Sequence, residues 1–185
     1  MVYVFLADGF EETEAIAPID MLHRAGKEVT TVGVTGKTVT SSHGISVIAD
    51  MTEDEFTDDS TNTDDIEMII LPGGMPGTLN EEASLVVQVA IDYCAENNIP
   101  IGAICAAPSI LGHKGLLNGK NAICYSGFEK ELHGAVIAKD KGVVTDGNII
   151  TARGAGVAIE FGLELVKVLC GIDVRDKIKE SILMD

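Results

Sequence analysis

The chain has 185 residues, enough for one domain with a sizeable core, and 46% of them are hydrophobic. Its 29 acidic residues outnumber its 13 basic residues, so the formal net charge is −16. Such a surface repels phosphate backbones and anionic lipid, and no basic run offsets it. We therefore expect no nucleic-acid partner and no membrane partner.

The cysteines indicate a reducing compartment. The chain has four of them, and none forms a C-x-x-C pair or a small disulfide scaffold. The chain begins directly with a strand-like run and contains no apolar stretch of membrane-spanning length. We therefore expect a reduced, cytoplasmic protein.

Strand-like and helix-like segments alternate along the first half of the chain. A helix should follow Asp8-Gly9 and end at Gly26, with Ile16, Ile19 and Leu22 on its buried face. Apolar and β-branched runs predict the strands. These runs cover residues 2–7, 28–34, 37–41, 45–49 and 66–71.

Residues 52–65 hold seven acidic residues and no basic one. The favoured interpretation is a solvated surface connection. A divalent-cation site is the alternative, although no ligand spacing supports it.

The second half continues the alternation. One helix is predicted over 82–97, with Leu85, Val86, Val89, Ala90 and Tyr93 at helical spacing on its buried face. A second helix should begin at Pro108 and a third after Arg153. A short tail helix is predicted with Asp173 as its cap. Strands are predicted over 99–104 and 121–124, and as a hairpin around Asp146-Gly147. This order predicts one domain over residues 1–185, an α/β doubly wound, mostly parallel sheet sandwiched by helices, with a small β-hairpin.

Cys105 lies where a buried strand turns sharply into a helix. Pro108 suits the first turn of that helix, and the small neighbours Ala103, Ala106 and Ala107 allow the backbone to crowd. This is the pattern of a nucleophile elbow with a thiol in place of a hydroxyl, and a helix N-terminus behind it favours the thiolate. The alternative is a small hydrophobic residue that fills a tight corner.

Three stretches fall at the carboxyl ends of predicted strands, where sites form in such sheets. They are 8–14, 72–77 and 105–106. The Gly73-Gly74 turn lacks the lysine and hydroxyl of a phosphate loop, so no nucleotide is indicated. Its backbone N–H groups, with that of Ala106, can form an oxyanion hole; an ordinary tight turn is the alternative.

Four separated motifs resemble those of the ThiJ/PfpI superfamily, most closely the branch that contains the parkinsonism-associated protein deglycase. The motifs are Gly9-Phe10-Glu11-Glu12-Thr13-Glu14, Leu71-Pro72-Gly73-Gly74-Met75-Pro76-Gly77, Ala103-Ile104-Cys105-Ala106-Ala107-Pro108 and Thr151-Ala152-Arg153-Gly154-Ala155-Gly156. The resemblance implies a flavodoxin-like fold and a homodimer. It also implies a reactive Cys105, a protonated Glu14 against it, and the amides of Gly74 and Ala106 beside it. In that branch a cation from the partner subunit approaches the pocket, and Arg24 and His43 are the matching positions.

The chain departs from the superfamily pattern at two positions. Ala106 stands where peptidases of the superfamily place a histidine, and Tyr125 stands where some relatives have another. A phenol is a poor general base at neutral pH, so peptidase activity is not expected. Tyr125 and Ser126 can still orient a substrate by hydrogen bonding.

An ionised Glu14 beside a thiolate would be repelled, so one of the two must hold a proton. A protonated Glu14 can donate to the Cys105 thiolate, which can add to an aldehyde, and Glu14 can then shuttle a proton between adjacent carbons. We expect a glyoxalase or deglycase reaction, such as methylglyoxal to lactate, without metal, cofactor or glutathione. The alternative is a redox sensor or redox-gated chaperone that responds to oxidation of Cys105. Asp8, Glu11 and Glu12 are expected to be solvated and not catalytic.

Overall fold

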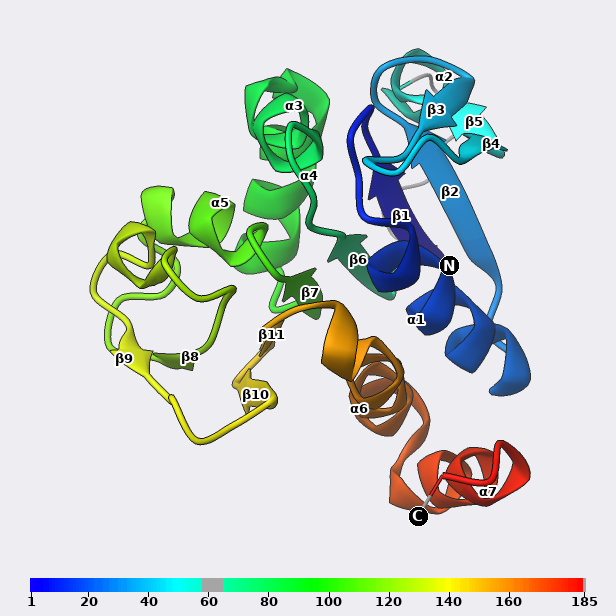
Figure 1. Cartoon of the computed structure of the whole chain (residues 1–185), viewed down its shortest axis with the longest axis vertical. Helices are drawn as coiled ribbons and strands as arrows, with labels where there is room; N and C mark the ends of the chain where they lie inside the picture. Colours follow the sequence, from blue (N-terminus) through cyan, green and yellow to red (C-terminus); the bar gives the residue numbers. More distant parts are fainter. Residues whose placement is uncertain (58–64, 185) are drawn as a thin grey trace.

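A seven-stranded, mostly parallel sheet forms the centre of the protein in this computed structural model, which describes residues 1–57 and 65–184. The strands follow the order β10-β11-β7-β6-β1-β2-β5, and only β10 runs antiparallel to its neighbour. The predicted α/β doubly wound fold is confirmed (Figure 1). The strands are β1 (Val2–Leu6), β2 (Val29–Gly33), β5 (Met51–Thr52), β6 (Met68–Leu71), β7 (Ile101–Ile104), β10 (Val143–Asp146) and β11 (Ile149–Ala152).

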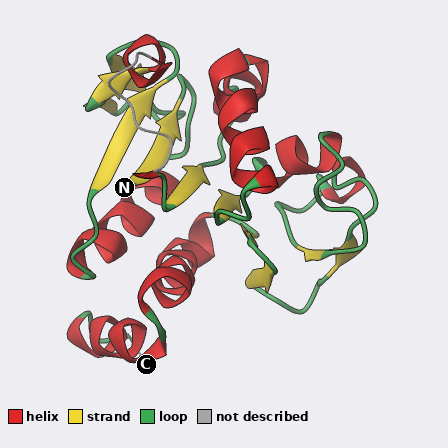
Figure 2. Ribbon diagram, turned by 180° about the vertical axis from the view of Figure 1, so that it is seen from behind, coloured by secondary structure: helices red, strands yellow, loops and turns green. Residues whose placement is uncertain are grey.

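Helices cover both faces of the sheet, so its central strands are apolar along their whole length. The seven α-helices among the described residues are α1 (Glu12–Arg24), α2 (Glu53–Thr57), α3 (Gly77–Ala83), α4 (Leu85–Glu96), α5 (Pro108–His113), α6 (Ala158–Cys170) and α7 (Ile172–Ser181). One core joins α1, α6 and α7 to alternate strand residues such as Val4 and Ile70. The other joins α2, α4 and α5 to the intervening residues, such as Phe5 and Leu71. Figure 2 shows the two helical layers from behind.

Helices α1 and α6 pack side by side on one face of the sheet (Figure 1). Gly162 allows this approach, because a Cβ atom there would lie 2.9 Å from the Cα of Pro18 and 2.8 Å from the Cγ of Met21. This contact determines the buried face of α1, which is formed by Ala15, Pro18, Met21 and Leu22. The prediction that Ile16 lies on the buried face was wrong, because Ile16 is 48% exposed.

The predicted apolar face of α4 was wrong at Leu85 and Val89, whereas Ala90 is buried as predicted. Val87, Ala90, Ile91 and Cys94 are buried, whereas Leu85 is 77% exposed and Val89 is 58% exposed. Apolar residues surround the first turns of this helix, so their spacing does not select one face. The structure has two helices, α3 and α4, where the sequence predicted one; α3 runs from the end of the predicted turn at Gly77 to Ala83, just inside the predicted helix.

Two small sheets lie beside the central one. The predicted short strands at 37–41 and 45–49 are β3 (Thr38–Thr40) and β4 (Ser46–Ile48), which pair antiparallel. Strand β8 (Asn121–Ala122) pairs in parallel with β9 (Val136–Ile137) and is not part of the central sheet. The tail helix α7 begins after Gly171, so Asp173 lies in its first turn and is not its cap.

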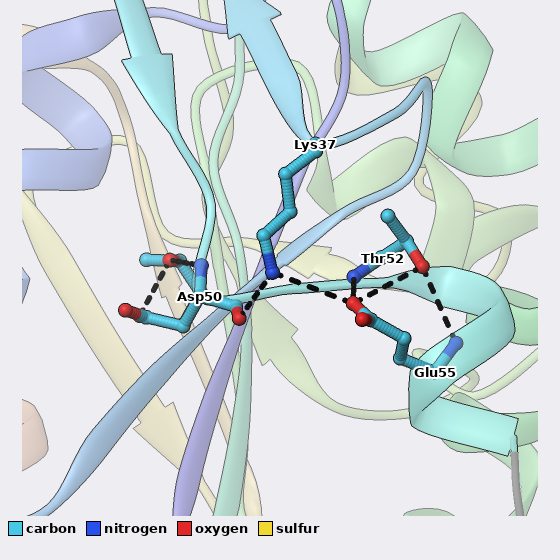
Figure 3. A network of polar contacts seen from close by, with 5 residues as sticks. Lys37, Asp50, Thr52 and Glu55 are labelled. Atoms are coloured by element: carbon cyan, nitrogen blue, oxygen red, sulfur yellow. Dashed lines mark hydrogen bonds and ion pairs between the residues drawn. The ribbon is translucent and has the colours of Figure 1, made fainter.

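The described part of the acidic segment contacts the core through one apolar residue, while Asp54 and Glu55 are exposed, as expected of a surface connection. In α2, Phe56 is buried and its ring packs edge-on against Tyr3 and Phe5. The N–H of Thr52 donates to Oε2 of Glu55 at 2.7 Å, and the N–H of Glu55 donates to Oγ1 of Thr52 at 3.3 Å, which is a capping box (Figure 3). Residues 58–64 lie outside the described residues. Among the helices described, none is long and apolar enough to cross a membrane.

Replacing Gly162 by alanine should destabilise the fold, because the new methyl group has no room between α1 and α6. Overpacking of this kind typically costs about 1–3 kcal/mol. Gly156→Ala is the matched control, since a Cβ atom at Gly156 would meet nothing within 4 Å. Urea unfolding of both variants measures the difference, and equal free energies of unfolding would contradict the packing described here.

Candidate active site

Cys105 occupies the predicted elbow between β7 and α5. Its φ of +65° is unusual for a residue with a side chain. Two backbone hydrogen bonds hold it there: its N–H donates to the carbonyl of Ala152 in β11, and its carbonyl accepts from the N–H of Tyr125, both at 2.8 Å. The neighbouring residues Ala106 and Ala107 are buried, so the turn is packed as well as hydrogen-bonded.

Glu14 reaches this elbow from the first turn of α1. Glu14 is only 1% exposed. The N–H of Gly73 donates to its Oε2 at 3.1 Å, the N–H of Ala155 donates to the same carboxyl group, and the thiol of Cys105 is its third partner. The carboxyl group thus joins the ends of β6, β7 and β11 at the carboxyl edge of the sheet.

The two side chains control each other's protonation. Burial raises the pKa of Glu14 to about 7, against the hydrogen bonds from Cys105 and two backbone amides, which lower it. Burial, followed by the charge of Glu14 and the hydrogen bond to it, raises the pKa of Cys105 to about 12. The charge of Glu14 and the hydrogen bond to its carboxylate raise the pKa of Cys105 only while Glu14 is ionised. A protonated Glu14 has no charge and can donate to the sulfur, so the pair titrates as a unit.

Backbone amides surround the sulfur at the positions expected from the sequence. The N–H groups of Gly74 and Ala106 donate toward Cys105 and lower its pKa, so they oppose the effect of burial. Gly73 is required by space, because a Cβ atom there would lie 2.5 Å from both the Cβ of Cys105 and Oε2 of Glu14. The amides can therefore approach the reacting atoms without interference from a side chain.

The other predicted pocket residues lie at different distances from the pair. The exposed Tyr125 is near it: a Cβ atom at Gly154 would be 3.5 Å from the Tyr125 ring and 3.7 Å from Oε1 of Glu14. Ser126 is the next residue and is also exposed. Arg24 is ten residues beyond Glu14 on α1, about 15 Å along the axis, and pairs with Asp20 at 2.8 Å. Within one protomer it does not join the pair.

The acids near Glu14 have local partners; Asp8 is exposed, as expected, whereas Glu11 and Glu12 are half-buried. Glu11 caps α1 by accepting from the N–H of Glu14 at 2.7 Å. Asp8 accepts from the N–H of Thr40 at 2.8 Å. Glu12 forms an ion pair with His43 at 2.9 Å, which places His43 at the N-terminal end of α1. One oxygen or nitrogen from each of Glu11, Glu12 and His43 lies within 4.8 Å of the others, which is the spacing of a possible metal site. However, the carboxylate of Glu11 already accepts the hydrogen bond that caps α1.

The sequence reasoning missed a second buried acid. Glu81 in α3 is fully buried, and among the described residues neither of its carboxyl oxygens has a hydrogen-bond partner. Burial raises the pKa of Glu81 well above its ordinary value, and the charge of Glu14 adds to this shift. Burial without a partner therefore favours the protonated, uncharged form of Glu81. It falls in the polar run Asn80-Glu81-Glu82, so the sequence offers no signal that it is buried.

Two clefts of the surface lie away from Cys105. One, of about 730 Å³, lies between β10, α6 and α7, and the other, of about 340 Å³, is lined by residues of α2 and α4. Neither is lined by Cys105 or Glu14.

Sequence reasoning also missed the Ala155 amide that donates to Glu14, although the glycines on either side of Ala155 indicate an accessible backbone.

Comparison with known proteins identifies similar chains. The family model described as the DJ-1/PfpI family matches residues 1–168. The protein dj-1beta of Drosophila melanogaster is 34% identical over 184 residues, which cover 98% of this chain and 95% of that protein. Deglycase PfpI of Pyrococcus furiosus is 34% identical over 174 residues, which cover 91% of this chain and 99% of that protein.

Solved structures show the same fold. The crystal structure of Drosophila melanogaster DJ-1beta has a TM-score of 0.90 at 32% identity and covers 100% of this chain and 97% of that chain. Oxidized Toxoplasma gondii DJ-1 has a TM-score of 0.89 at 32% identity and covers 99% of this chain and 97% of that chain.

Glu81 should make the folded protein less stable as the pH rises. An acid whose pKa is higher in the folded state stabilises that state below its unfolded pKa, and this contribution is lost as the pH rises toward the folded pKa. As the pH rises above about 4, the ordinary pKa of a glutamate, the wild type should therefore lose stability relative to Glu81→Gln, by at most about 1.4 kcal/mol per pH unit. Urea unfolding of both proteins at each pH measures this. A difference that is independent of pH would show that Glu81 is not a buried, protonated acid.

Proposed function

The chain belongs to the DJ-1/PfpI family, as its motifs predicted, and from this membership we propose that it is a cysteine-dependent glyoxalase or deglycase. Its substrates would be small reactive aldehydes such as methylglyoxal. The observation that carries the proposal is the contact between the buried carboxyl group of Glu14 and the thiol of Cys105. The deglycase name of one relative supports the same class of reaction.

The first step forms a bond between sulfur and the aldehyde carbon. With its proton on Glu14, the pair presents a thiolate, which is the nucleophilic form of cysteine. As the S–C bond forms, the carbonyl electrons move to oxygen. The N–H groups of Gly74 and Ala106 stabilise this oxyanion, and the proton of Glu14 neutralises it to give a hemithioacetal.

The second step moves a hydrogen between adjacent carbons. Glu14, now a carboxylate, removes the proton from the former aldehyde carbon and returns it to the neighbouring carbonyl carbon. The hydroxyl proton of the first carbon passes to the oxygen of the second, so the first carbon is oxidised to a thioester and the second is reduced to an alcohol, and no external oxidant or reductant is consumed. Water then cleaves the thioester, which releases lactate and restores the thiol.

We propose further that the protein acts as a homodimer in the cytoplasm. The apolar side chains of Ile16, Ile45 and Ile48 are exposed on α1 and the neighbouring hairpin. A second copy on this face would cover them, and Arg24 and His43 are the positions that the family resemblance matches to the cation in the partner's pocket. The four cysteines are free, which suits a reducing compartment.

Redox sensing is the second candidate function. Cys105 is only partly buried, whereas Cys94 and Cys124 are buried. A protonated Glu14 can donate to one oxygen of a cysteine sulfinate and the amides can hold the other, so oxidation can stop at that stage. A structure of the Toxoplasma gondii relative is described as oxidized.

Turnover of methylglyoxal without glutathione distinguishes the two functions. We expect lactate to form with the wild type, and Cys105→Ala and Glu14→Gln each to reduce kcat/KM by at least about 100-fold, since each removes a reacting group. Cys170→Ala is the matched control for the cysteine, and Glu28→Gln is the control for the acid. Both should retain activity within a few-fold. Absence of lactate with the wild type would contradict the enzyme proposal and leave redox sensing.

A further inference from the structure

Two of the four histidines of the chain meet on the surface, away from Cys105. His113 is the last residue of α5, and His133 follows the short 3-10 helix η2 (Glu129–Glu131). Gly112 lets these segments touch, because a Cβ atom there would lie 2.1 Å from the carbonyl oxygen of Glu131. Leu132 is buried between Glu131 and His133, so it anchors the two exposed residues on either side of it.

The side chains of this cluster have the spacing of metal ligands. Nε2 of His113 lies 3.0 Å from Oε2 of Glu131, and the rings of His113 and His133 have centroids 5.2 Å apart. One possible ligand atom from each of the three residues lies within 4.8 Å of the other two. Ligands of a tetrahedral zinc ion are about 3.3–3.6 Å apart, so small side-chain rotations bring the three atoms to these distances.

A fourth residue orients His113. Its Nδ1 lies 2.5 Å from Oε1 of Glu82, which α3 supplies. A histidine that binds a metal through one ring nitrogen usually donates the N–H of the other to a carboxylate. Glu82 can therefore hold the tautomer in which Nε2 of His113 faces Glu131 and His133 with its lone pair.

We propose that His113, Glu131 and His133 bind one divalent transition-metal ion of the zinc class, with Glu82 as a positioning residue. Two imidazoles and one carboxylate suit zinc, whereas magnesium and calcium prefer oxygen ligands. The net charge of −16 also favours a cation at the surface. The exposed cluster leaves a fourth position for water. The ion would join the end of α5 to η2 and, through Glu82, to α3. Helix α5 follows Cys105 in the chain, and α3 follows Gly74.

Titration of the full chain with Zn²⁺ by calorimetry tests this site. We expect one ion per chain, with affinity reduced about 10–100-fold in Glu82→Gln and by more than that in His113→Asn and His133→Asn. His23→Asn is the matched control, because His23 is exposed on α1 and belongs to no such cluster among the described residues, and the affinity of this variant should equal that of the wild type. Circular dichroism verifies that each variant is folded, and Glu131→Gln replaces any histidine variant that is not.

Titration with Co²⁺ identifies the ligands, because thiolate ligation gives an intense charge-transfer band that imidazole and carboxylate ligation lack. We expect d–d absorption without that band, and no comparable uptake of Mg²⁺. The proposal is overturned if the wild type does not bind one Zn²⁺ ion per chain. That result would show that His113 only forms an ordinary ion pair with its carboxylates. The proposal is also overturned if His113→Asn and His133→Asn bind as the wild type does, if Mg²⁺ binds equally well, or if the cobalt spectrum shows thiolate.

Discussion

The buried contact between Glu14 and Cys105 is the constraint on which the rest of the site depends. Glu14 is buried and Cys105 is partly buried, and this burial is the largest cause that raises the pKa of each. Two negative charges at this distance in such surroundings would repel strongly, so the pair retains one proton over a wide pH range. The position of that proton decides whether the sulfur is inert or nucleophilic. The backbone amides of Gly74 and Ala106 favour the nucleophilic form.

The fold brings the pair together by aligning the ends of parallel strands. Strand β6 leads to Gly73, β7 leads to Cys105 and β11 leads to Ala155, so three adjacent strands deliver one group each to the same carboxyl group. Helix α1 carries that carboxyl group into place, and Glu11 caps the helix at Glu14 itself. Chemistry at this edge follows from the topology of doubly wound sheets, while the glycine at position 73 gives the carboxyl and thiol the space to meet.

The sequence alone predicted the parts of this account that depend on local patterns. The elbow at Cys105 follows from an apolar strand, a run of small residues and Pro108, and the hairpin follows from Asp146-Gly147. The position of Glu14 required the family resemblance, because nothing local separates it from Glu11 and Glu12. The buried faces of α1 and α4 depended on contacts such as that of Gly162, which lies far from α1 in the sequence. Glu81 was unpredictable for the same reason: its burial is a property of the packed molecule.

The rate at which iodoacetamide alkylates Cys105, measured across pH, tests the shared proton most directly. If the pair holds one proton, the rate rises through the titration near pH 7 and then becomes constant, because the ratio of the two protonated forms no longer depends on pH. Cys105→Ala gives the background from the other thiols, and Glu14→Gln should abolish the plateau. An independent thiol with a pKa of about 12 would instead show a rate that keeps rising about tenfold per pH unit, and that profile would contradict the account.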